Sequence, residues 1–189
     1  MLVNHKLYNK YKSAIVSRRE DQINEIVIHG TAGGGSADDL IKWMLSGERS
    51  AEYEKGEALF HYLIDFDGTI TNLIPDLGVV YHSSAGKHDR YTIGIELMNT
   101  EKDNSGEYTD DQYESLKVLT YTLLSLFPIT SITGHERNAQ IYSNIISKKV
   151  PCPGNFEWNR IDNWLNANNM FYRKNEEGDK FYEIAQKAV

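Results

Sequence analysis

The chain has 189 residues, 40% of them hydrophobic and 25% charged, with a formal net charge of -7, which is typical of one soluble globular domain with a sizeable core. The negative charge disfavours a polyanion such as nucleic acid as a partner, since no basic run exceeds two residues. The single cysteine cannot form an internal disulfide, and no segment resembles a Sec signal peptide or reaches the length of a membrane span.

The first clear elements are a strand and a helix. The run EIVIHG at Glu25–Gly30 is short, apolar and ended by glycine, as expected of a buried strand. A glycine-rich loop follows, and Ser36 with Asp39 three residues later forms a capping-box pattern. The helix that we expect after it has an apolar face made of Leu40, Ile41, Met44 and Leu45.

Two further β segments follow. Residues 58–74 contain two β-rich runs around Asp67-Gly68, which predicts a hairpin. Residues 91–99, YTIGIELMN, predict another strand, in which Glu96 is a charged residue inside an apolar run.

The second half of the chain predicts helices around one short strand. A capping box at Thr109–Gln112 opens a helix with apolar residues at helical spacing, which Pro128 ends. The segment SITGHE at 131–136 predicts a strand that runs into a turn, and 158–165 and 180–187 predict two later helices.

These elements predict an α/β fold with a central mixed β-sheet flanked by helices. We expect one domain over residues 1–189, with a core from about 25 to 165 and a helical C-terminal extension over 166–189.

Two of the six histidines end apolar strands beside glycine, namely His29 and His135. A strand end is rigid, and a neighbouring glycine leaves room for a ligand. Zinc prefers imidazole nitrogen and thiolate sulfur, and a catalytic zinc site uses three protein ligands. His29, His135 and Cys152 could supply that set, although packing or hydrogen bonding is the commoner role for any one histidine.

Cys152 has other possible roles, because a cysteine can also be a buried small hydrophobe, a nucleophile or half of an intermolecular disulfide. It lies between Pro151 and Pro153, which hold the backbone extended and exclude a regular helix. Such a segment can present a metal ligand rigidly.

Other polar residues could act beside such a site. Alternation places Glu96 opposite its apolar neighbours, either in solvent or, if the sheet is covered on both faces, at a site where it could serve as a general base. Lys148 and Lys149 are either solvated or close enough to stabilise an oxyanion. His82 follows a strand-like run in a glycine-containing loop and suits substrate contact, whereas His61 is flanked by strand residues and reads as structural.

Six blocks of the sequence carry a family resemblance: EIVIHGTAGG, FHYLIDFDGTITNLI, YHSSAG, YTIGIELMN, ITGHE and CPGNFEW. In this order they resemble the zinc-dependent N-acetylmuramoyl-L-alanine amidases. That group includes phage lysozyme-type amidases, amidases of wall recycling and the peptidoglycan recognition proteins. The resemblance runs from about Glu25 to Trp158, and the order of the six blocks makes it specific.

The resemblance implies that His29 and His135 are zinc ligands, that Cys152 is the third ligand, and that Glu96 is catalytic. It implies an amidase and peptidoglycan-recognition-protein-like fold. His82 matches a family histidine that contacts substrate, and we also expect Thr31 and Asn99 to contact substrate.

The sequence departs from the family pattern at three places. Other members use a tyrosine at the position of Phe60, which has no hydroxyl. The family lysine stands two residues before the third ligand, where this chain has Val150, so Lys149 is the candidate catalytic lysine three residues before it. The stretch AQIYSNIIS at 139–147 reads as an insertion between His135 and Cys152.

The resemblance therefore implies zinc-dependent hydrolysis of the amide bond between N-acetylmuramic acid and L-alanine in peptidoglycan. Two alternatives are a peptidoglycan-binding module without catalysis and a zinc peptidase that cuts the stem peptide. We expect a monomer that binds peptidoglycan or a muropeptide, and neither nucleic acid nor membrane. We expect synthesis in the cytoplasm without a signal peptide, followed by action on the wall as a phage endolysin or a virion component; a cytoplasmic recycling enzyme is another possibility.

Overall fold

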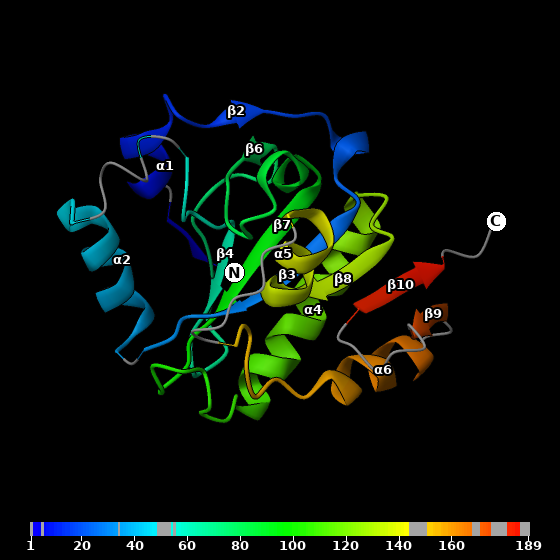
Figure 1. Cartoon of the computed structure of the whole chain (residues 1–189). Coiled ribbons are helices and arrows are strands. Elements are labelled where there is room, and N and C mark those ends of the chain that lie inside the picture. The colour runs from blue at the N-terminus through cyan, green and yellow to red at the C-terminus, as the bar shows by residue number, and fades with distance from the viewer. Residues whose placement is uncertain are drawn as a thin grey trace.

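The computed structural model describes residues 2–4, 6–33, 35–48, 54, 56–143, 151–167, 171–174 and 181–185 (Figure 1). Strands and helices follow one another along the chain in this order: β1 (Leu2–Val3), α1 (Lys6–Tyr11), β2 (Val16–Ser17), η1 (Glu20–Gln22), β3 (Glu25–Gly30), α2 (Ala37–Ser46), β4 (Tyr62–Ile64), β5 (Ile70–Asn72), β6 (Gly78–Val79), η2 (Gly86–Tyr91), β7 (Thr92–Leu97), α4 (Asp110–Leu126), β8 (Ser131–Gly134), α5 (His135–Ser143), α6 (Trp158–Ala167), β9 (Phe171–Lys174) and β10 (Phe181–Ala185). The two short elements η1 and η2 are 3₁₀ helices.

The strands form one large mixed sheet in the order β1-β5-β4-β7-β3-β8-β10-β9, and β2 pairs with β6 separately. The four central strands β4, β7, β3 and β8 are parallel, while β5 and β10 pair antiparallel with their neighbours. The α/β fold with a mixed sheet is therefore confirmed. Because parallel strands share an orientation, the carboxyl ends of β7, β3 and β8 meet at one edge, which is where ligands bind in such sheets.

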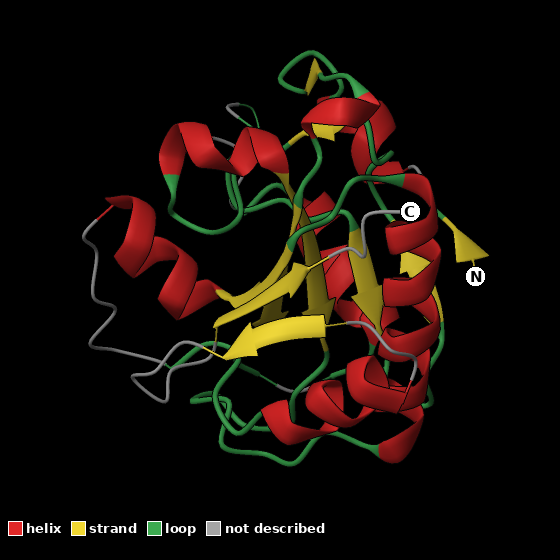
Figure 2. Cartoon of the chain, turned by 90° about the vertical axis from the view of Figure 1, so that its right-hand side faces the viewer, coloured by secondary structure: helices red, strands yellow, loops and turns green. Residues whose placement is uncertain are grey.

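Helices cover both faces of this sheet (Figures 1 and 2). One apolar cluster joins Ile26, Ile28 and Ile95 to α4 and α6, and a second joins Leu63 on the opposite face to α1 and α2. Successive residues of a strand point to opposite faces, so His29 and Glu96 lie on the face that α1 and α2 cover. This two-sided burial is what removes Glu96 from bulk solvent.

The predicted helix starts and the hairpin are confirmed. The side chain of Ser36 accepts a hydrogen bond from the Asp39 amide, and that of Thr109 from the Gln112 amide; each pair forms a complete capping box. The hairpin pairs β4 with β5, and Gly68 in its turn has φ +78°. A side chain there would also meet the backbone of α4, so the turn requires glycine on two grounds.

Two predictions about the second half of the chain are wrong. The strand β8 was expected to run into a turn, but the helix α5 begins directly after it, at His135. Residues 181–185, expected to be helical, form β10, which pairs antiparallel with β8 and β9. Pairing satisfies the otherwise open edge of β8, and this tertiary gain outweighs a local helical pattern. The expected helix over 158–165 is confirmed as α6.

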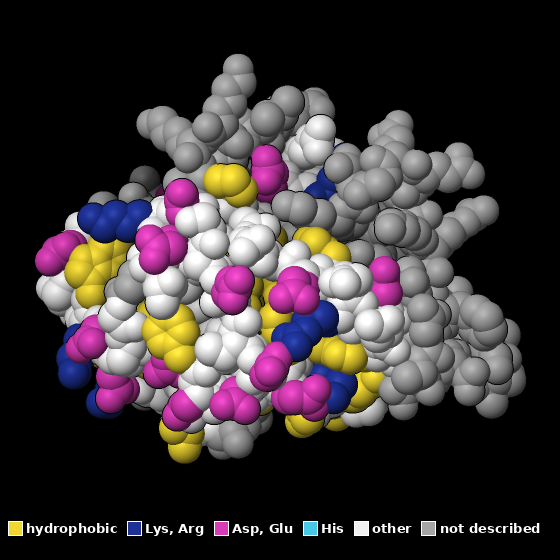
Figure 3. All heavy atoms as spheres, turned by 90° about the horizontal axis from the view of Figure 1, so that it is seen from below, with side chains coloured by type: hydrophobic (Ala, Val, Ile, Leu, Met, Phe, Trp, Pro, Cys, Tyr) yellow, Lys and Arg dark blue, Asp and Glu magenta, His cyan; other side chains and the backbone are white. Residues whose placement is uncertain are grey.

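On the face that Figure 3 shows, the described acidic side chains are spread between apolar ones, with few basic side chains among them. Among the described residues, no helix is both long enough and apolar enough to cross a membrane.

Candidate metal centre

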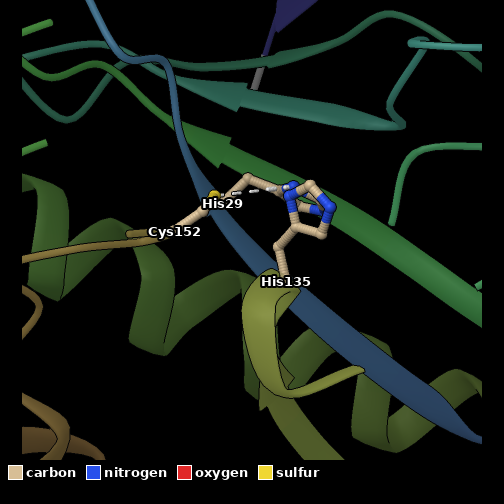
Figure 4. Close-up of side chains that lie close together, drawn as sticks. All are labelled: His29, His135 and Cys152. Atoms are coloured by element: carbon tan, nitrogen blue, oxygen red, sulfur yellow. Dashed lines mark hydrogen bonds between the residues drawn. The ribbon is translucent and has the colours of Figure 1, made fainter. Parts of the chain in front are cut away.

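Three segments bring His29, His135 and Cys152 together at the carboxyl edge of the sheet (Figure 4). His29 is the penultimate residue of β3, His135 is the first residue of α5 directly after β8, and Cys152 comes from the segment before α6. One ligand atom of each lies within 4.8 Å of the other two. The Cys152 Sγ is 3.9 Å from His29 Nδ1, and the two imidazole centroids are 4.6 Å apart. The predicted ligand set is thus a spatial cluster.

The cluster fits a zinc ion in donor type and in size. Tetrahedral zinc with nitrogen and sulfur ligands holds neighbouring donors about 3.3 to 3.6 Å apart, so closing this cluster requires movements of about 1 Å. Burial lowers the pKa of His135 to about 4. Burial also lowers the pKa of His29 well below its ordinary value, and repulsion from His135 lowers it further. Both rings are therefore neutral at pH 7, and only a neutral imidazole has a lone pair for a metal.

A chain of hydrogen bonds sets which nitrogen of His29 carries that lone pair. His29 Nε2 is 2.9 Å from His82 Nδ1, His82 Nε2 is 2.8 Å from Thr92 Oγ1, and the Thr92 hydroxyl donates to the Asp89 carbonyl at 3.1 Å. Because the Thr92 hydroxyl proton is used in that last bond, Thr92 Oγ1 accepts from His82 Nε2. The other nitrogen of the neutral His82 ring, Nδ1, then accepts from His29 Nε2. The Nδ1 of His29 is then unprotonated, and it is this atom that faces Cys152. An outer partner of this kind is typical of metal-bound histidines.

His82 lies behind His29, and its side chain is 2% exposed, so it positions the ligand. The residue also lines the cavity over the cluster, and its contact with substrate stays a prediction. Gly94 in β7 makes room for it, since a Cβ at that position would lie 2.8 Å from the His82 ring. His61 is confirmed as structural: it is fully buried, accepts from the Gly94 amide and contacts the Gly78 carbonyl.

Glu96 lies next to His29 on the same face of the sheet. The two residues are paired across β3 and β7, and Glu96 Oε2 is 4.0 Å from His29 Nδ1. Its side chain is 13% exposed, and burial raises the pKa of Glu96 to about 8. A carboxylate so placed beside a metal position can accept a proton from a water molecule and return it.

A cavity of about 990 Å³ opens over this cluster. Its walls come from α2 and from the loops around 57–60 and 81–87, and include Leu40, Trp43, Glu57, Phe60, Tyr81 and Lys87. Phe60 lines it at the position where other family members were expected to have tyrosine, so no hydroxyl is offered there. An apolar and aromatic wall with a few polar groups is typical of a small-molecule site.

The other predicted site residues divide into three groups. Thr31 lines the cavity, and its hydroxyl accepts from the Asn99 amide and donates to the Gly33 carbonyl. Asn99 itself is fully buried and holds its own loop through the Glu101 amide and the Gly106 carbonyl, and its contact with substrate stays a prediction. Lys148, Lys149 and the latter part of the predicted insertion lie outside the described residues.

A polar network beneath His135 was not predicted. Glu25, at the start of β3 and 1% exposed, accepts from Thr133 Oγ1 at 2.7 Å, from Asn138 Nδ2 at 3.0 Å and contacts His88 Nε2 at 2.6 Å. Asn138 lies one turn after His135, so this network ties the helix that presents His135 to the strand that presents His29. The sequence signal for this network was a charged residue, Glu25, at the start of a buried strand.

Comparison with known proteins agrees with this geometry. A family model described as N-acetylmuramoyl-L-alanine amidase matches residues 19–155. The chain is 32% identical over 108 residues to the 1,6-anhydro-N-acetylmuramyl-L-alanine amidase AmpD of Enterobacter cloacae, a match that covers 52% of each chain. The chain thus spans about half the length of this curated relative.

Two solved structures share the fold. The endolysin N-acetylmuramoyl-L-alanine amidase LysCS from Clostridium intestinale URNW superposes with a TM-score of 0.61 at 25% identity, covering 81% of this chain and 90% of that chain. Drosophila PGRP-LB in complex with tracheal cytotoxin superposes with a TM-score of 0.56 at 18% identity, covering 79% and 85% of the two chains. The second likeness concerns the fold alone.

Proposed function

The chain belongs to the N-acetylmuramoyl-L-alanine amidase family, and from this premise we propose that it hydrolyses the amide bond between the lactyl group of N-acetylmuramic acid and L-alanine. The observation that carries the proposal is the convergence of His29, His135 and Cys152 with Glu96 at the base of one cavity. A module that only binds peptidoglycan has no need of a buried carboxylate beside a complete ligand set.

The groups at the site have separate roles in the proposed hydrolysis. Zinc bound by His29, His135 and Cys152 supplies a Lewis acid that acidifies water and polarises a carbonyl. Glu96 takes the proton of the attacking water and then gives it to the amide nitrogen as the carbon–nitrogen bond breaks. The water oxygen ends in the new carboxylate of the lactyl group, and L-alanine leaves with a new amino terminus. Glu96 suits both steps because its carboxyl group lies beside the ligand set, 4.0 Å from His29 Nδ1, and lines the cavity.

The proposed substrate is peptidoglycan or a muropeptide derived from it. The cavity is at the upper end of the range for small-molecule sites, about 300 to 1,000 Å³, and is large enough for a sugar with the first stem residues. PGRP-LB, which has the same fold, binds tracheal cytotoxin. Trp43, Phe60 and Tyr81 provide aromatic surface in the cavity, and Lys87 and Glu57 provide charges of both signs.

The proposed setting is wall lysis, in the manner of an endolysin, after synthesis in the cytoplasm and release to the wall. The likeness to LysCS, 90% of which the chain covers, supports this setting. The likeness to AmpD supports recycling of soluble anhydro-muropeptides as a second setting. Rates on intact sacculi and on soluble muropeptides, measured side by side, distinguish the two: wall lysis requires the faster reaction on sacculi.

The experiment is to count the amino termini released from purified sacculi. The zinc-loaded protein should release L-alanine termini, the chelator-treated protein should not, and added zinc should restore the reaction. Glu96→Ala should abolish release while keeping stoichiometric zinc, whereas the exposed Glu107→Ala serves as the matched control. Amino termini other than L-alanine would identify a stem-peptide peptidase, and wall binding without any release would identify a binding module.

A further inference from the structure

Asn104 lies in the loop between β7 and α4, and it is 1% exposed. Its φ is +58°, in the left-handed region that asparagine tolerates better than most residues other than glycine. Its amide donates to the Glu101 carbonyl at 3.0 Å, which closes the turn. The turn therefore holds the side chain in a fixed direction, toward the candidate metal centre.

The side-chain amide of Asn104 connects two of the segments that carry metal ligands. Its Oδ1 accepts from the Ala32 amide at 2.7 Å, and its Nδ2 donates to the Gly30 carbonyl at 3.3 Å and to the Pro151 carbonyl at 3.0 Å. Gly30 directly follows His29, and Pro151 directly precedes Cys152. The amide orientation is unambiguous, because both partners of Nδ2 are carbonyl oxygens and the partner of Oδ1 is an N–H group.

The backbone around Asn104 is packed just as closely against the cysteine segment. The Asn155 amide donates to the Asn104 carbonyl at 3.0 Å. A Cβ added at Gly154 would lie 2.4 Å from the Asn104 carbonyl oxygen, and one added at Gly30 would lie 2.8 Å from its Oδ1. A side chain at either glycine would therefore clash with Asn104, and one at Gly30 would clash with the Tyr108 hydroxyl as well, at 2.2 Å.

From these contacts we infer that Asn104 is a positioning residue for the third metal ligand. It fixes the 151–155 segment against the end of β3, and so sets the distance between the Cys152 thiolate and His29 Nδ1, 3.9 Å in this structure. The Gly30 amide donates to the Cys152 sulfur at 3.4 Å and so ties the same two segments together. The inference rests on the proposed zinc-dependent function, since it assigns Asn104 a role toward that metal.

The inference also explains how Cys152 is held against β3. Cys152 follows His135 by 17 residues, and Pro151 and Pro153 stiffen only the cysteine's own backbone. Stiffness within a segment does not fix its position relative to β3; an external bond does. Tyr108, whose hydroxyl donates to the Pro153 carbonyl at 2.6 Å, holds the other side of the cysteine.

The test compares two substitutions at this position. Asn104→Asp keeps the shape and the Oδ1 acceptor but turns the donor that faces Gly30 and Pro151 into an acceptor. Asn104→Gly removes the side chain and tolerates the positive φ, so it folds even if the aspartate variant does not. Asn155→Ala is the control, because it removes only the 3.4 Å bond from an exposed side chain of the same segment to the Ser105 carbonyl and leaves the backbone bond to Asn104.

Three readouts report on the ligand and not on activity. We expect both Asn104 variants to bind zinc about 10- to 100-fold more weakly in competition with a chromophoric chelator, the usual cost of losing an outer partner of a metal ligand. We expect cobalt substitution to give a weaker thiolate-to-metal absorption band. Because Cys152 is the only cysteine, its reaction with a disulfide reagent in the metal-free protein isolates its mobility, and we expect the rate to rise about tenfold in both variants.

The outcome is decisive in each case. Zinc affinity within about threefold of wild type, with an unchanged thiolate band and thiol rate in a folded Asn104→Gly protein, would overturn the inference. Equal effects in Asn155→Ala would also overturn it, because they would mean that any change in the segment suffices. If the wild type binds zinc but releases no L-alanine termini, the proposed function fails while these readouts still decide the role of Asn104. If the wild type binds no zinc, the thiol rate decides it.

Discussion

Replacing Glu96 with glutamine should stabilise the metal-free protein at pH 8 and leave it nearly unchanged at pH 4. Burial raises the pKa of Glu96 from its ordinary value of 4.5 to about 8. The folded state therefore binds this proton more tightly than the unfolded state does. The resulting stability is fully present below pH 4.5 and is lost as the pH rises through 8. Glutamine, which does not titrate, suffers no such loss.

The size of the effect follows from the pKa. One pKa unit corresponds to about 1.36 kcal/mol, so moving the pKa from 4.5 to about 8 has a ceiling of about 5 kcal/mol. The side chain is 13% exposed at the base of an open cavity, and water that enters the cavity reduces the cost of the charge. We expect the glutamine variant to gain about 2 to 5 kcal/mol relative to wild type between pH 4 and pH 9.

The assay is urea unfolding of chelator-treated proteins, followed by circular dichroism at intervals from pH 4 to pH 9. Only the difference between wild type and variant matters, because the buried histidines contribute equally to both. Glu107→Gln, at an exposed position, controls for the general effect of removing one negative charge. A difference between wild type and Glu96→Gln that stays constant across this range would refute the argument that Glu96 is a desolvated carboxyl.

Three further predictions follow from the site. His82→Ala should weaken zinc binding about 10- to 100-fold in chelator competition, because His29 loses the acceptor that fixes its tautomer; unchanged affinity in a folded variant would contradict this. Gly30→Ala should lower the free energy of unfolding by about 1 to 3 kcal/mol, since its Cβ would lie 2.2 Å from the Tyr108 hydroxyl; Tyr108→Phe, which alone removes the bond to the Pro153 carbonyl, should cost less in the Gly30→Ala chain than in wild type, and equal costs would place the clash elsewhere. Free zinc at about a thousand times its Kd should stabilise the protein by about 4 kcal/mol; calorimetry should show the gain shrinking in Cys152→Ser, and an equal gain would remove that residue from the ligand set.

Local patterns in the sequence predicted most of the central elements. The two capping boxes, the hairpin and the buried strands depend on residues within a few positions of one another, and the structure has all of them. The segment 181–185 was mispredicted for the converse reason. Its strand is stabilised by β8, which lies about fifty residues earlier, and no local spacing reports such a partner.

The ligand set was predictable because its residue types are distinctive. Two histidines at strand ends and one cysteine between prolines point to a metal without any knowledge of strand order. The partners of these ligands were not predictable in the same way. His82 was assigned to substrate because it lies in a loop, whereas in three dimensions Gly94 admits its ring behind His29. The signal was a glycine in a neighbouring strand, and its meaning depends on which strands are adjacent.

Glu96 shows where alternation alone stops being informative. The alternating pattern correctly placed the Glu96 side chain on the face opposite Ile93 and Ile95, but it could not predict whether that face is exposed to water. Burial there comes from helices contributed by the first 46 residues, and the exit to solvent is the cavity that α2 borders. The position that makes Glu96 a suitable base, buried beside the ligand set and open to one cavity, is therefore created by distant segments of the chain. The same holds for Asn104, whose three side-chain bonds join pieces of backbone that are up to 74 positions away in sequence. Residue types in the sequence identify the chemistry, and contacts between distant segments determine whether it is held at working distance.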